Sequence, residues 1–331
     1  MSPPPDIAIL VPAYNEAATI AQVIEQFHAE LPHAQIWVIN NNSKDETHAI
    51  ADSTLKRLGA RGGVLFEQRQ GKAFAVRHGV HMVEADMYVL VDGDTTYPAS
   101  SVHALIAPVA ENRADMAVGD RISGGHYARE NKRALHGMGN GLVMRLINTL
   151  FGAKLHDVMS GYRAFTRTFI KTYPILIDGF EIETDITLHA LDKRQRIIEI
   201  PIDYKDRPDG SMSKLNTMTD GLRVLTTIFN IFRIYKPMAF FGIPALVLAL
   251  AGIALGAIPV IEFMQTRFIT HVPLAILATG LEIFSLVLVA VALILDTVAH
   301  NARVNFELQL LRFNYRRCER AELPPGGGGT G

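Results

Sequence analysis

The sequence is poor in cysteine and carries almost no net charge. A single cysteine, Cys318, excludes an intrachain disulfide framework and is typical of a protein whose soluble part folds in a reducing compartment. The formal net charge is −1 over 331 residues, which argues against a general nucleic-acid binder, because such proteins normally present a basic face. The histidines and the cysteine do not form a cluster with zinc-ligand spacing.

Two familiar signals are missing from the N-terminal part. Pro12 to Glu16 follow the first apolar run, where a dinucleotide-binding protein would carry Gly-x-Gly-x-x-Gly. Residues 1–6 are rich in proline, and the apolar run after them is too short for a cleavable signal peptide. We therefore expect this part of the chain to remain in the cytoplasm.

Long apolar runs are present only in the C-terminal third. Residues 238–261 contain no charge and give about 36 Å of helix at ~1.5 Å per residue, enough to cross a bilayer core of about 30 Å. Residues 272–295 form a second run, interrupted only by Glu282. A carboxylate is costly in lipid, so Glu282 suggests a helix–helix contact, within one chain or between protomers.

Basic residues flank the outer ends of both runs and predict that both ends lie in the cytoplasm, as an in–out–in hairpin. They are Arg233, Lys236, Arg303, Arg312, Arg316, Arg317 and Arg320. Residues 216–237 carry a helical apolar pattern, which fits an interfacial juxtamembrane helix or a core helix about equally. We expect residues 299–322 to form a cytoplasmic amphipathic helix, and the Pro- and Gly-rich residues 323–331 to be a disordered tail.

Residues 1–215 have the pattern of an α/β domain, in which short apolar strands alternate with amphipathic helices. This pattern predicts a mostly parallel, Rossmann-like sheet covered on both faces. The expected strands are residues 7–11, 36–39, 64–66, 87–91, 116–118 and 197–204. The expected helices are residues 17–31, 46–58, 72–84, 100–111, 135–150 and 183–193.

Polar clusters follow three of these strands. Asp92-Gly93-Asp94 ends the fourth strand, Val11 to Glu16 end the first, and Asn40 to Asp45 end the second. Carboxyl ends of parallel strands meet at one edge of a sheet, so we expect a shared crevice there. Two carboxylates one residue apart suit a hard divalent cation, Mg²⁺ or Mn²⁺, which readily shares its oxygen ligands with a nucleotide diphosphate.

This ordered set resembles the nucleotide-sugar-binding half of the family-2 inverting glycosyltransferases, which have the GT-A fold. Asp157-Val158-Met159-Ser160-Gly161-Tyr162-Arg163 and Arg207-Pro208-Asp209-Gly210-Ser211-Met212-Ser213-Lys214 resemble motifs of one branch, the polyprenyl-phosphate glycosyltransferases. That branch contains dolichyl-phosphate mannose synthase and bactoprenol glucosyltransferases. The resemblance covers about residues 6–236, and the two apolar runs fit the same branch.

The resemblance implies a set of donor-site residues. It places Asp92 and Asp94 on the metal, with Thr96 as a weaker further ligand because a hydroxyl is a poorer donor than a carboxylate. Lys72 is a candidate contact to the diphosphate at a helix N-terminus. Asn40 and Asn42 stand where the family usually has Asp-Asp-Gly, which leaves the identity of the base less certain. The nucleotide-sugar site as a whole comprises Pro12, Ala13, Tyr14, Glu16, Asn40, Asn42, Lys72, Asp92 and Gly93.

The resemblance also implies a lipid monophosphate as acceptor. Its second pKa lies near ~6, so it is largely a dianionic nucleophile already and needs cations more than a strong base. Asp157 resembles the reaction-centre carboxylate of the family, and we favour positioning over proton abstraction for it. The candidate phosphate-binding residues are Ser160, Arg163, Arg207, Ser213 and Lys214, and the catalytic set is Asp157, Arg163 and Arg207.

Two further predictions concern residues near these motifs. His126, His136 and His156 are interpreted as loop or surface residues. Glu181 and Glu183 precede a helix and are interpreted as capping residues, with a role in organising the acceptor site as the alternative.

The implied function is transfer of a hexose from a UDP-sugar to polyprenyl phosphate by a multi-pass, homo-oligomeric protein, a tetramer by resemblance. The expected location is the inner (cytoplasmic) membrane. UDP-glucose is the favoured donor, ahead of UDP-N-acetylhexosamine, UDP-galactose and GDP-mannose. A processive polysaccharide synthase would need Gln-x-x-Arg-Trp, but the only tryptophan is Trp37, inside an expected strand. A soluble-acceptor glycosyltransferase and an inactive scaffold are the remaining alternatives.

Overall fold

The computed structural model describes residues 5–123, 134–176, 182–204, 226 and 229–322. Its internal contacts divide the chain into two units. The first comprises Met1–Leu215 and Arg312–Gly331, and the second comprises Asn216–Leu311. We describe each unit by itself.

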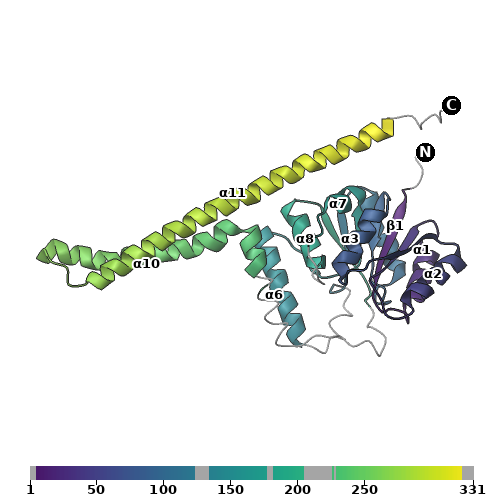
Figure 1. Cartoon of the computed structure of the whole chain (residues 1–331), viewed down its shortest axis with the longest axis horizontal. Coiled ribbons are helices and arrows are strands. Elements are labelled where there is room, and N and C mark those ends of the chain that lie inside the picture. Colours follow the sequence, from purple (N-terminus) through teal and green to yellow (C-terminus); the bar gives the residue numbers. More distant parts are fainter. Residues whose placement is uncertain (1–4, 124–133, 177–181, 205–225, 227–228, 323–331) are drawn as a thin grey trace. The chain divides into compact units, whose positions relative to one another are not determined.

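Seven strands in the described part of the first unit form one sheet, in the order β3-β2-β1-β4-β6-β5-β7 (Figure 1). Their bounds are β1 Ile7–Ala13, β2 Gln35–Asn40, β3 Arg61–Phe66, β4 Met87–Leu90, β5 Met116–Asp120, β6 Arg163–Thr166 and β7 Ile197–Pro201. Only β6 is antiparallel to its neighbours β4 and β5. The predicted mostly parallel α/β fold is therefore confirmed, with β6 added to it.

Helices cover both faces of the sheet, because alternate strand residues point to opposite sides. Helices α1 (Ile20–Glu30), α2 (Thr47–Leu58) and α4 (Val102–Ala110) bury their apolar residues with Ile9 and Val11 of β1. Helices α3 (Lys72–Met82), α7 (Arg167–Thr172) and α8 (Ile182–Asp192) pack with Ala8 and Leu10 of the same strand. The described structure of this unit also has η1 (Ala99–Ser101) and α6 (Ala134–Phe151).

The strand order reverses beside β1. From β1 the chain passes outward to β2 and β3, then returns to β4 on the other side of β1. Such a reversal leaves a crevice at the carboxyl ends of the two central strands, since the crossovers leave in opposite directions. The loops after β1 and β4 therefore meet at one edge of the sheet. The predicted polar clusters at the ends of these two strands, Val11 to Glu16 and Asp92 to Asp94, lie at this edge.

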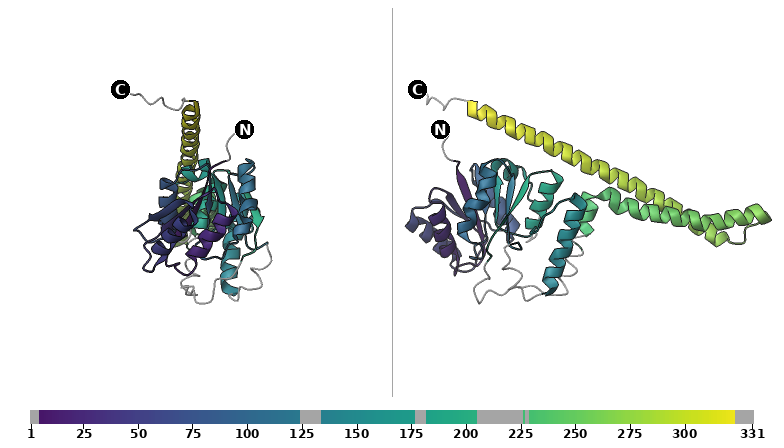
Figure 2. Two further views of the ribbon diagram at one scale, coloured as in Figure 1. Left: turned by 90° about the vertical axis from the view of Figure 1, so that its right-hand side faces the viewer. Right: turned by 180° about the vertical axis from the view of Figure 1, so that it is seen from behind.

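The second unit is built around a helical hairpin, whose two helices run side by side (Figure 2). Helix α10 spans Pro237–Thr266, and α11 spans Val272–Glu322, of which the part up to Leu311 belongs to this unit. Both are long and apolar enough to cross a membrane. No glycine or proline occurs between residues 281 and 322, so α11 continues without a break from the second apolar run into the predicted amphipathic helix. Of the predicted juxtamembrane helix, residues 229–235 are described and helical.

Small residues allow α10 and α11 to approach closely. A Cβ atom added to Gly252 would lie 2.6 Å from Oε1 of Glu282. Ser285 donates a hydrogen bond of 2.8 Å to the carbonyl of Ala245 across the same interface. Glu282 therefore makes the helix–helix contact that the sequence suggests, and it does so within one chain.

Candidate active site

The loops after β1 and β2 are joined by hydrogen bonds into one wall of the crevice. Asn15, in the left-handed region with φ 57°, accepts a bond of 2.8 Å from the amide of Lys44. Its own amide donates to Oγ of Ser43 at 3.0 Å, and the amide of Glu16 donates to Oγ1 of Thr47 at 2.8 Å. Pro12 and Ala13 are buried at the end of β1, while Tyr14 is 38% exposed. The structure thus brings together the predicted clusters Val11 to Glu16 and Asn40 to Asp45.

Three asparagines, at the end of β2 and directly after it, stabilise this region through their side chains. The side-chain oxygen of Asn40 accepts the amide of Ser43 at 3.0 Å, and Nδ2 of Asn42 donates to the carbonyl of Gln68 at 3.2 Å. Asn41, which sequence reasoning did not single out, holds the following loop through the carbonyl of Arg69 and the amide of Gly71. The side-chain hydrogen bonds described for these three asparagines therefore stabilise the loops after β2 and β3.

The Asp92-Gly93-Asp94 turn is separated from β4 only by Val91 and lies against the β1 loop. Thr19 donates from Oγ1 to the carbonyl of Gly93 at 2.7 Å and to Oε2 of Glu16 at 3.1 Å. Asp94 is buried, and its Oδ1 accepts a bond of 2.6 Å from Oγ1 of Thr96. In this structure the Thr96 hydroxyl orients Asp94, and its contact with a metal stays a prediction.

The chemistry of the Asp92–Asp94 turn fits a divalent cation. Both groups are carboxylates, the hard oxygen ligands that Mg²⁺ and Mn²⁺ prefer. The Asp92 side chain is 26% exposed, which leaves it accessible from the crevice. Its negative charge is balanced here by Lys72, with which it forms an ion pair. The predicted metal ligand Asp92 and the predicted diphosphate contact Lys72 are thus in direct contact.

Lys72 lies at the first residue of α3 and contacts two carboxylates. Besides Asp92, its Nζ contacts Oε1 of Glu183 at 2.5 Å. Burial by itself would lower the pKa of Lys72, but the charges of Asp92 and Glu183 outweigh it and raise the pKa above its ordinary value. Lys72 is therefore a fixed positive charge beside the Asp92–Asp94 turn. Its partner Glu183 lies in the first turn of α8, where the sequence suggested a cap or, as the alternative, a role in organising the acceptor site.

The acceptor-side motif reaches the same turn through Gly161. A Cβ atom added there would lie 2.8 Å from Oδ2 of Asp92 and 3.1 Å from Nζ of Lys72. The amide of Gly161 donates to the hydroxyl of Tyr97 at 2.8 Å. A side chain at this position would have to displace the ends of the Asp92 and Lys72 side chains. The predicted donor and acceptor motifs are thus adjacent.

Asp157 is buried and paired with Arg121, a residue that follows β5. Nε of Arg121 lies 2.7 Å from Oδ2 and Nη2 lies 2.9 Å from Oδ1, while the backbone amide of Arg121 also donates to Oδ2 at 3.1 Å. The guanidinium lies over the ring of Tyr204, 5.4 Å from its centroid. The sequence did not single out Arg121, because nothing local indicates a partner 36 residues away.

Arg163 is placed differently from its prediction. It begins β6, opposite Leu90 of β4 and Val118 of β5, and is 0% exposed. Its guanidinium donates to the carbonyls of Ser160 at 2.8 Å and Val158 at 2.8 Å. A third bond of 2.9 Å goes to Oγ1 of Thr187 on α8. Burial lowers the pKa of Arg163. This geometry does not fit a direct grip on a lipid phosphate; it fits support of the acceptor loop.

The remaining predicted acceptor residues are described only in part. Ser160 is fully buried, and its hydroxyl accepts a bond of 3.4 Å from the amide of Tyr162. Arg207, Ser213 and Lys214 lie outside the described residues. So do His126 and the side chain of His136.

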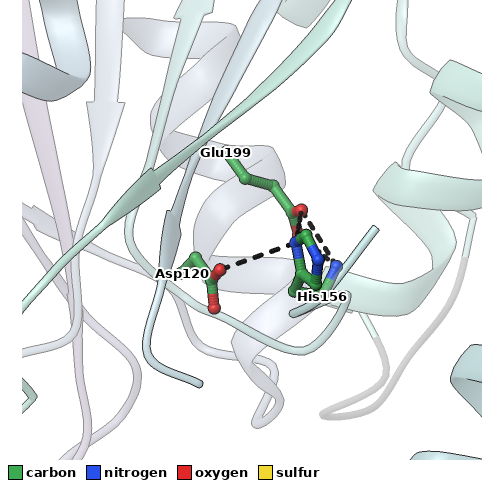
Figure 3. Close-up of side chains that lie close together, drawn as sticks. All are labelled: Asp120, His156 and Glu199. Atoms are coloured by element: carbon green, nitrogen blue, oxygen red, sulfur yellow. Dashed lines mark hydrogen bonds and ion pairs between the residues drawn. The ribbon is translucent and has the colours of Figure 1, made fainter. Parts of the chain in front are cut away.

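His156 belongs to a cluster that its interpretation as a plain loop residue missed. Asp120, His156 and Glu199 bring three potential ligand atoms within 4.8 Å of one another (Figure 3). Nδ1 of His156 lies 3.0 Å from Oε2 of Glu199 and 3.8 Å from Oδ2 of Asp120. The cluster has the composition of a metal site. Glu199 also accepts the backbone amides of His156 and Asp157, each at 2.8 Å from Oε1, so it fixes the loop that carries Asp157.

The comparison with protein families agrees with this geometry. The model of glycosyl transferase family 2 matches residues 8–173, which is half of the chain and includes most of β1, the Asp92–Asp94 turn and the Asp157 loop. The chain belongs to glycosyl transferase family 2. This glycosyltransferase is also similar to glycosyltransferase AglJ of Haloferax volcanii, with 29% identity over 97% of this chain and 100% of the relative.

Two further relatives carry names that describe their acceptors. The dolichyl-phosphate hexose transferase of Haloferax volcanii is 26% identical over 68% of this chain and 93% of its own length. The polyprenol monophosphomannose synthase of Mycolicibacterium smegmatis is 24% identical over 63% of this chain and 80% of its own length.

Solved structures confirm the GT-A-like fold of the first unit. Glucosyl-3-phosphoglycerate synthase from Mycobacterium tuberculosis, crystallised with Mn²⁺, UDP and phosphoglyceric acid, superposes with a TM-score of 0.55. The identity is 20%, and the match covers 69% of this chain and 78% of the synthase. At this identity the likeness establishes the fold.

Proposed function

We propose that this glycosyltransferase moves a hexose from a nucleotide diphosphate sugar to polyprenyl phosphate, with UDP-glucose as the favoured donor. The observation that carries the proposal is that one chain joins the Asp92–Lys72 crevice to two apolar helices of membrane-spanning length. A lipid acceptor explains this combination, because its phosphate lies at the bilayer surface. The names of the relatives with dolichyl-phosphate and polyprenol acceptors support the same acceptor class.

On the donor side, Asp92 and Asp94 would hold Mg²⁺ or Mn²⁺, with Thr96 orienting Asp94. When bound, the cation supplies Lewis-acid neutralisation of the leaving diphosphate. Lys72 adds a positive charge to the same diphosphate. Pro12, Ala13, Tyr14 and Glu16 would contact the nucleoside from the β1 loop. Asn40 and Asn42 contribute by fixing the opposing loops, and Gly93 fixes Thr19 through its carbonyl.

On the acceptor side, an oxygen of the lipid phosphate attacks the anomeric carbon. The bond from that carbon to the nucleotide diphosphate breaks, and the configuration inverts. The nucleophile is ionised near neutral pH, so Asp157 acts by holding Arg121 at the reaction centre rather than by removing a proton. Arg207, Ser213 and Lys214 are the proposed phosphate contacts. Ser160 is as fully buried as Arg163, and both would support the acceptor loop from within the domain.

We further propose that the hairpin anchors the protein in the inner membrane with both ends in the cytoplasm, as the basic flanks indicate. The domain organisation would be a cytoplasmic catalytic domain (1–215), a juxtamembrane helix (216–237) and the spans (238–298). A cytoplasmic helix (299–322) and a tail (323–331) complete it. Homo-oligomerisation, to a tetramer, is proposed from the family resemblance.

One experiment tests this function directly. Purified full-length protein is incubated with Mg²⁺, undecaprenyl phosphate and, separately, UDP-glucose, UDP-galactose, UDP-N-acetylglucosamine and GDP-mannose. We expect a lipid product whose mass equals that of undecaprenyl phosphate plus one hexose, with UDP-glucose as donor. Transfer to soluble hydroxyl acceptors, with none to the lipid, would refute the proposed acceptor.

A further inference from the structure

Glu183 is the second carboxylate partner of the buried Lys72 ammonium. The Glu183 side chain is 9% exposed and that of Lys72 is 13% exposed, and Nζ and Oε1 are 2.5 Å apart. Glu183 comes from α8 and Lys72 from α3, which pack against the same face of the sheet. The pair therefore connects the donor crevice to an element that carries none of the metal or nucleoside residues named above.

Lys72 needs more than one carboxylate. It is the first residue of α3, where the positive end of the helix dipole disfavours a cation. A cation that reaches the Asp92–Asp94 turn before the diphosphate would take the Asp92 carboxylate away from Lys72. An ammonium buried without a partner is strongly unfavourable. Glu183 can keep hold of Lys72 at this moment, because it lies apart from the Asp92–Asp94 turn in the sequence and comes from another helix.

Glu183 is itself held in a network that extends to the acceptor loop. Its backbone carbonyl accepts a bond of 2.8 Å from Oγ1 of Thr187, one helical turn later. The same Thr187 oxygen also accepts a hydrogen bond from Nη1 of Arg163. The other guanidinium nitrogens of Arg163 donate to the carbonyls of Val158 and Ser160. One face of α8 thus supports the donor lysine through residue 183 and the acceptor loop through residue 187.

We propose that Glu183 is a positioning residue of the donor site, which holds the Lys72 ammonium in place for the diphosphate of the nucleotide sugar when Asp92 binds the cation. This inference rests on the proposed function for the identity of the donor. It assigns Glu183 no contact with the sugar, the nucleotide or the metal.

The test measures nucleotide binding by calorimetry, with UDP and GDP as probes in the presence of Mg²⁺, so that no transfer is required. Glu183→Gln keeps the shape of the side chain and removes the charge. We expect it to weaken UDP binding at least about tenfold, which is ~1.4 kcal/mol. Asp185→Asn on the same helix is the matched control, because Asp185 instead accepts the hydroxyl of Tyr173 at 2.5 Å. It should leave UDP affinity unchanged.

Coupling between the two residues separates positioning from a general structural role. In a Lys72→Ala background, Glu183→Gln should weaken UDP binding by less than about twofold further, because the residue that it positions is gone. Thermal midpoints of all variants check folding, and Glu183→Asp replaces Glu183→Gln if the latter does not fold. Additive losses in the double variant, or wild-type affinity in a folded Glu183→Gln protein, would overturn the inference.

The outcomes also distinguish this inference from the proposed function. Wild-type protein that binds UDP but transfers no sugar to undecaprenyl phosphate would refute the proposed acceptor, while the Glu183 inference would still be judged by affinity. Wild-type protein that binds neither UDP nor GDP would overturn both.

Discussion

Arg121 and Asp157 form a two-pronged ion pair at the carboxyl edge of the sheet, with nitrogen–oxygen distances of 2.7 and 2.9 Å. The Arg121 side chain is 13% exposed and that of Asp157 is 2% exposed. The carboxylate that the family resemblance places at the reaction centre is therefore already engaged by a cation from another loop. This arrangement favours positioning over proton abstraction.

The first prediction follows from this pair. Arg121→Ala and Asp157→Asn should each lower kcat for lipid transfer, and the double variant should be no slower than the worse single variant, because both changes break one unit. The measurement is a double-mutant cycle on initial rates. Multiplying losses in the double variant would mean that Asp157 acts independently, as a base would.

The second prediction concerns the metal turn. Asp94→Asn keeps the shape of the side chain but removes the charge that would hold the cation. Loss of electrostatic stabilisation of this kind costs about 10²–10³ in rate, so transfer should fall at least about a hundredfold, and chelation of wild-type protein should have the same effect. Mn²⁺ titration and the thermal midpoint, measured without substrate, separate lost metal binding from misfolding. Full activity of the variant would remove Asp94 from the metal site.

The third prediction tests the buried Arg163. Replacing it with methionine leaves the carbonyls of Val158 and Ser160 and the hydroxyl of Thr187 without this donor. Each such buried group costs about 1–3 kcal/mol. Arg163→Lys should destabilise nearly as much, because lysine lacks the planar fork that reaches three acceptors. Thermal unfolding without substrate is the measurement.

A contrary result for Arg163 is easy to recognise. If Arg163→Lys unfolds at the wild-type temperature but requires more polyprenyl phosphate for half-maximal rate, the residue binds the acceptor directly and the first interpretation from the sequence is restored.

The fourth prediction concerns pH and the buried His189 of α8. Burial lowers the pKa of His189 to about 4, below its ordinary value of 6.5, so the folded protein keeps the ring neutral. The unfolded chain takes up the proton first as the pH falls through 6.5, and stability is lost between pH 6.5 and pH 4. At about 1.4 kcal/mol per pH unit, the loss reaches ~2 kcal/mol by pH 5.

His189→Leu provides the comparison, since leucine can fill the space beside Phe169 and Tyr173. The difference in stability between wild type and variant should shift against the wild type by this amount from pH 7 to pH 5. Parallel curves for the two proteins would show that His189 is protonated in the folded state or does not contribute.

The fifth prediction tests the topology. Thr266→Cys and Lys56→Cys, each in a Cys318→Ser background, place single thiols at the hairpin turn and on the exposed part of α2. A membrane-impermeant maleimide should label them from opposite sides of sealed vesicles. Labelling of both thiols from one side would mean that the hairpin does not span the bilayer.

The sequence by itself determined the alternation of strands and helices, the two apolar helices and the three polar strand ends. These features are local, because apolar periodicity and uninterrupted apolar length are written in consecutive residues. The strand β6 was not predicted from the sequence, because Arg163–Thr166 is short and begins with an arginine, a residue typical of a polar loop. Its position between β4 and β5 comes from pairing with residues far away in the chain.

The partners of the charged residues were decided only by the tertiary structure. Arg121 lies 36 residues from Asp157, and Lys72 lies 111 residues from Glu183, distances over which no periodicity links two side chains. Burial also changed the interpretation of Arg163. From the sequence, an arginine in such a motif is expected to bind an anion, but in the structure it is buried within the sheet. The sequence could name the charged residues of the site, but which of them face a substrate and which hold one another depends on the packing of β6 and α8 against the crevice.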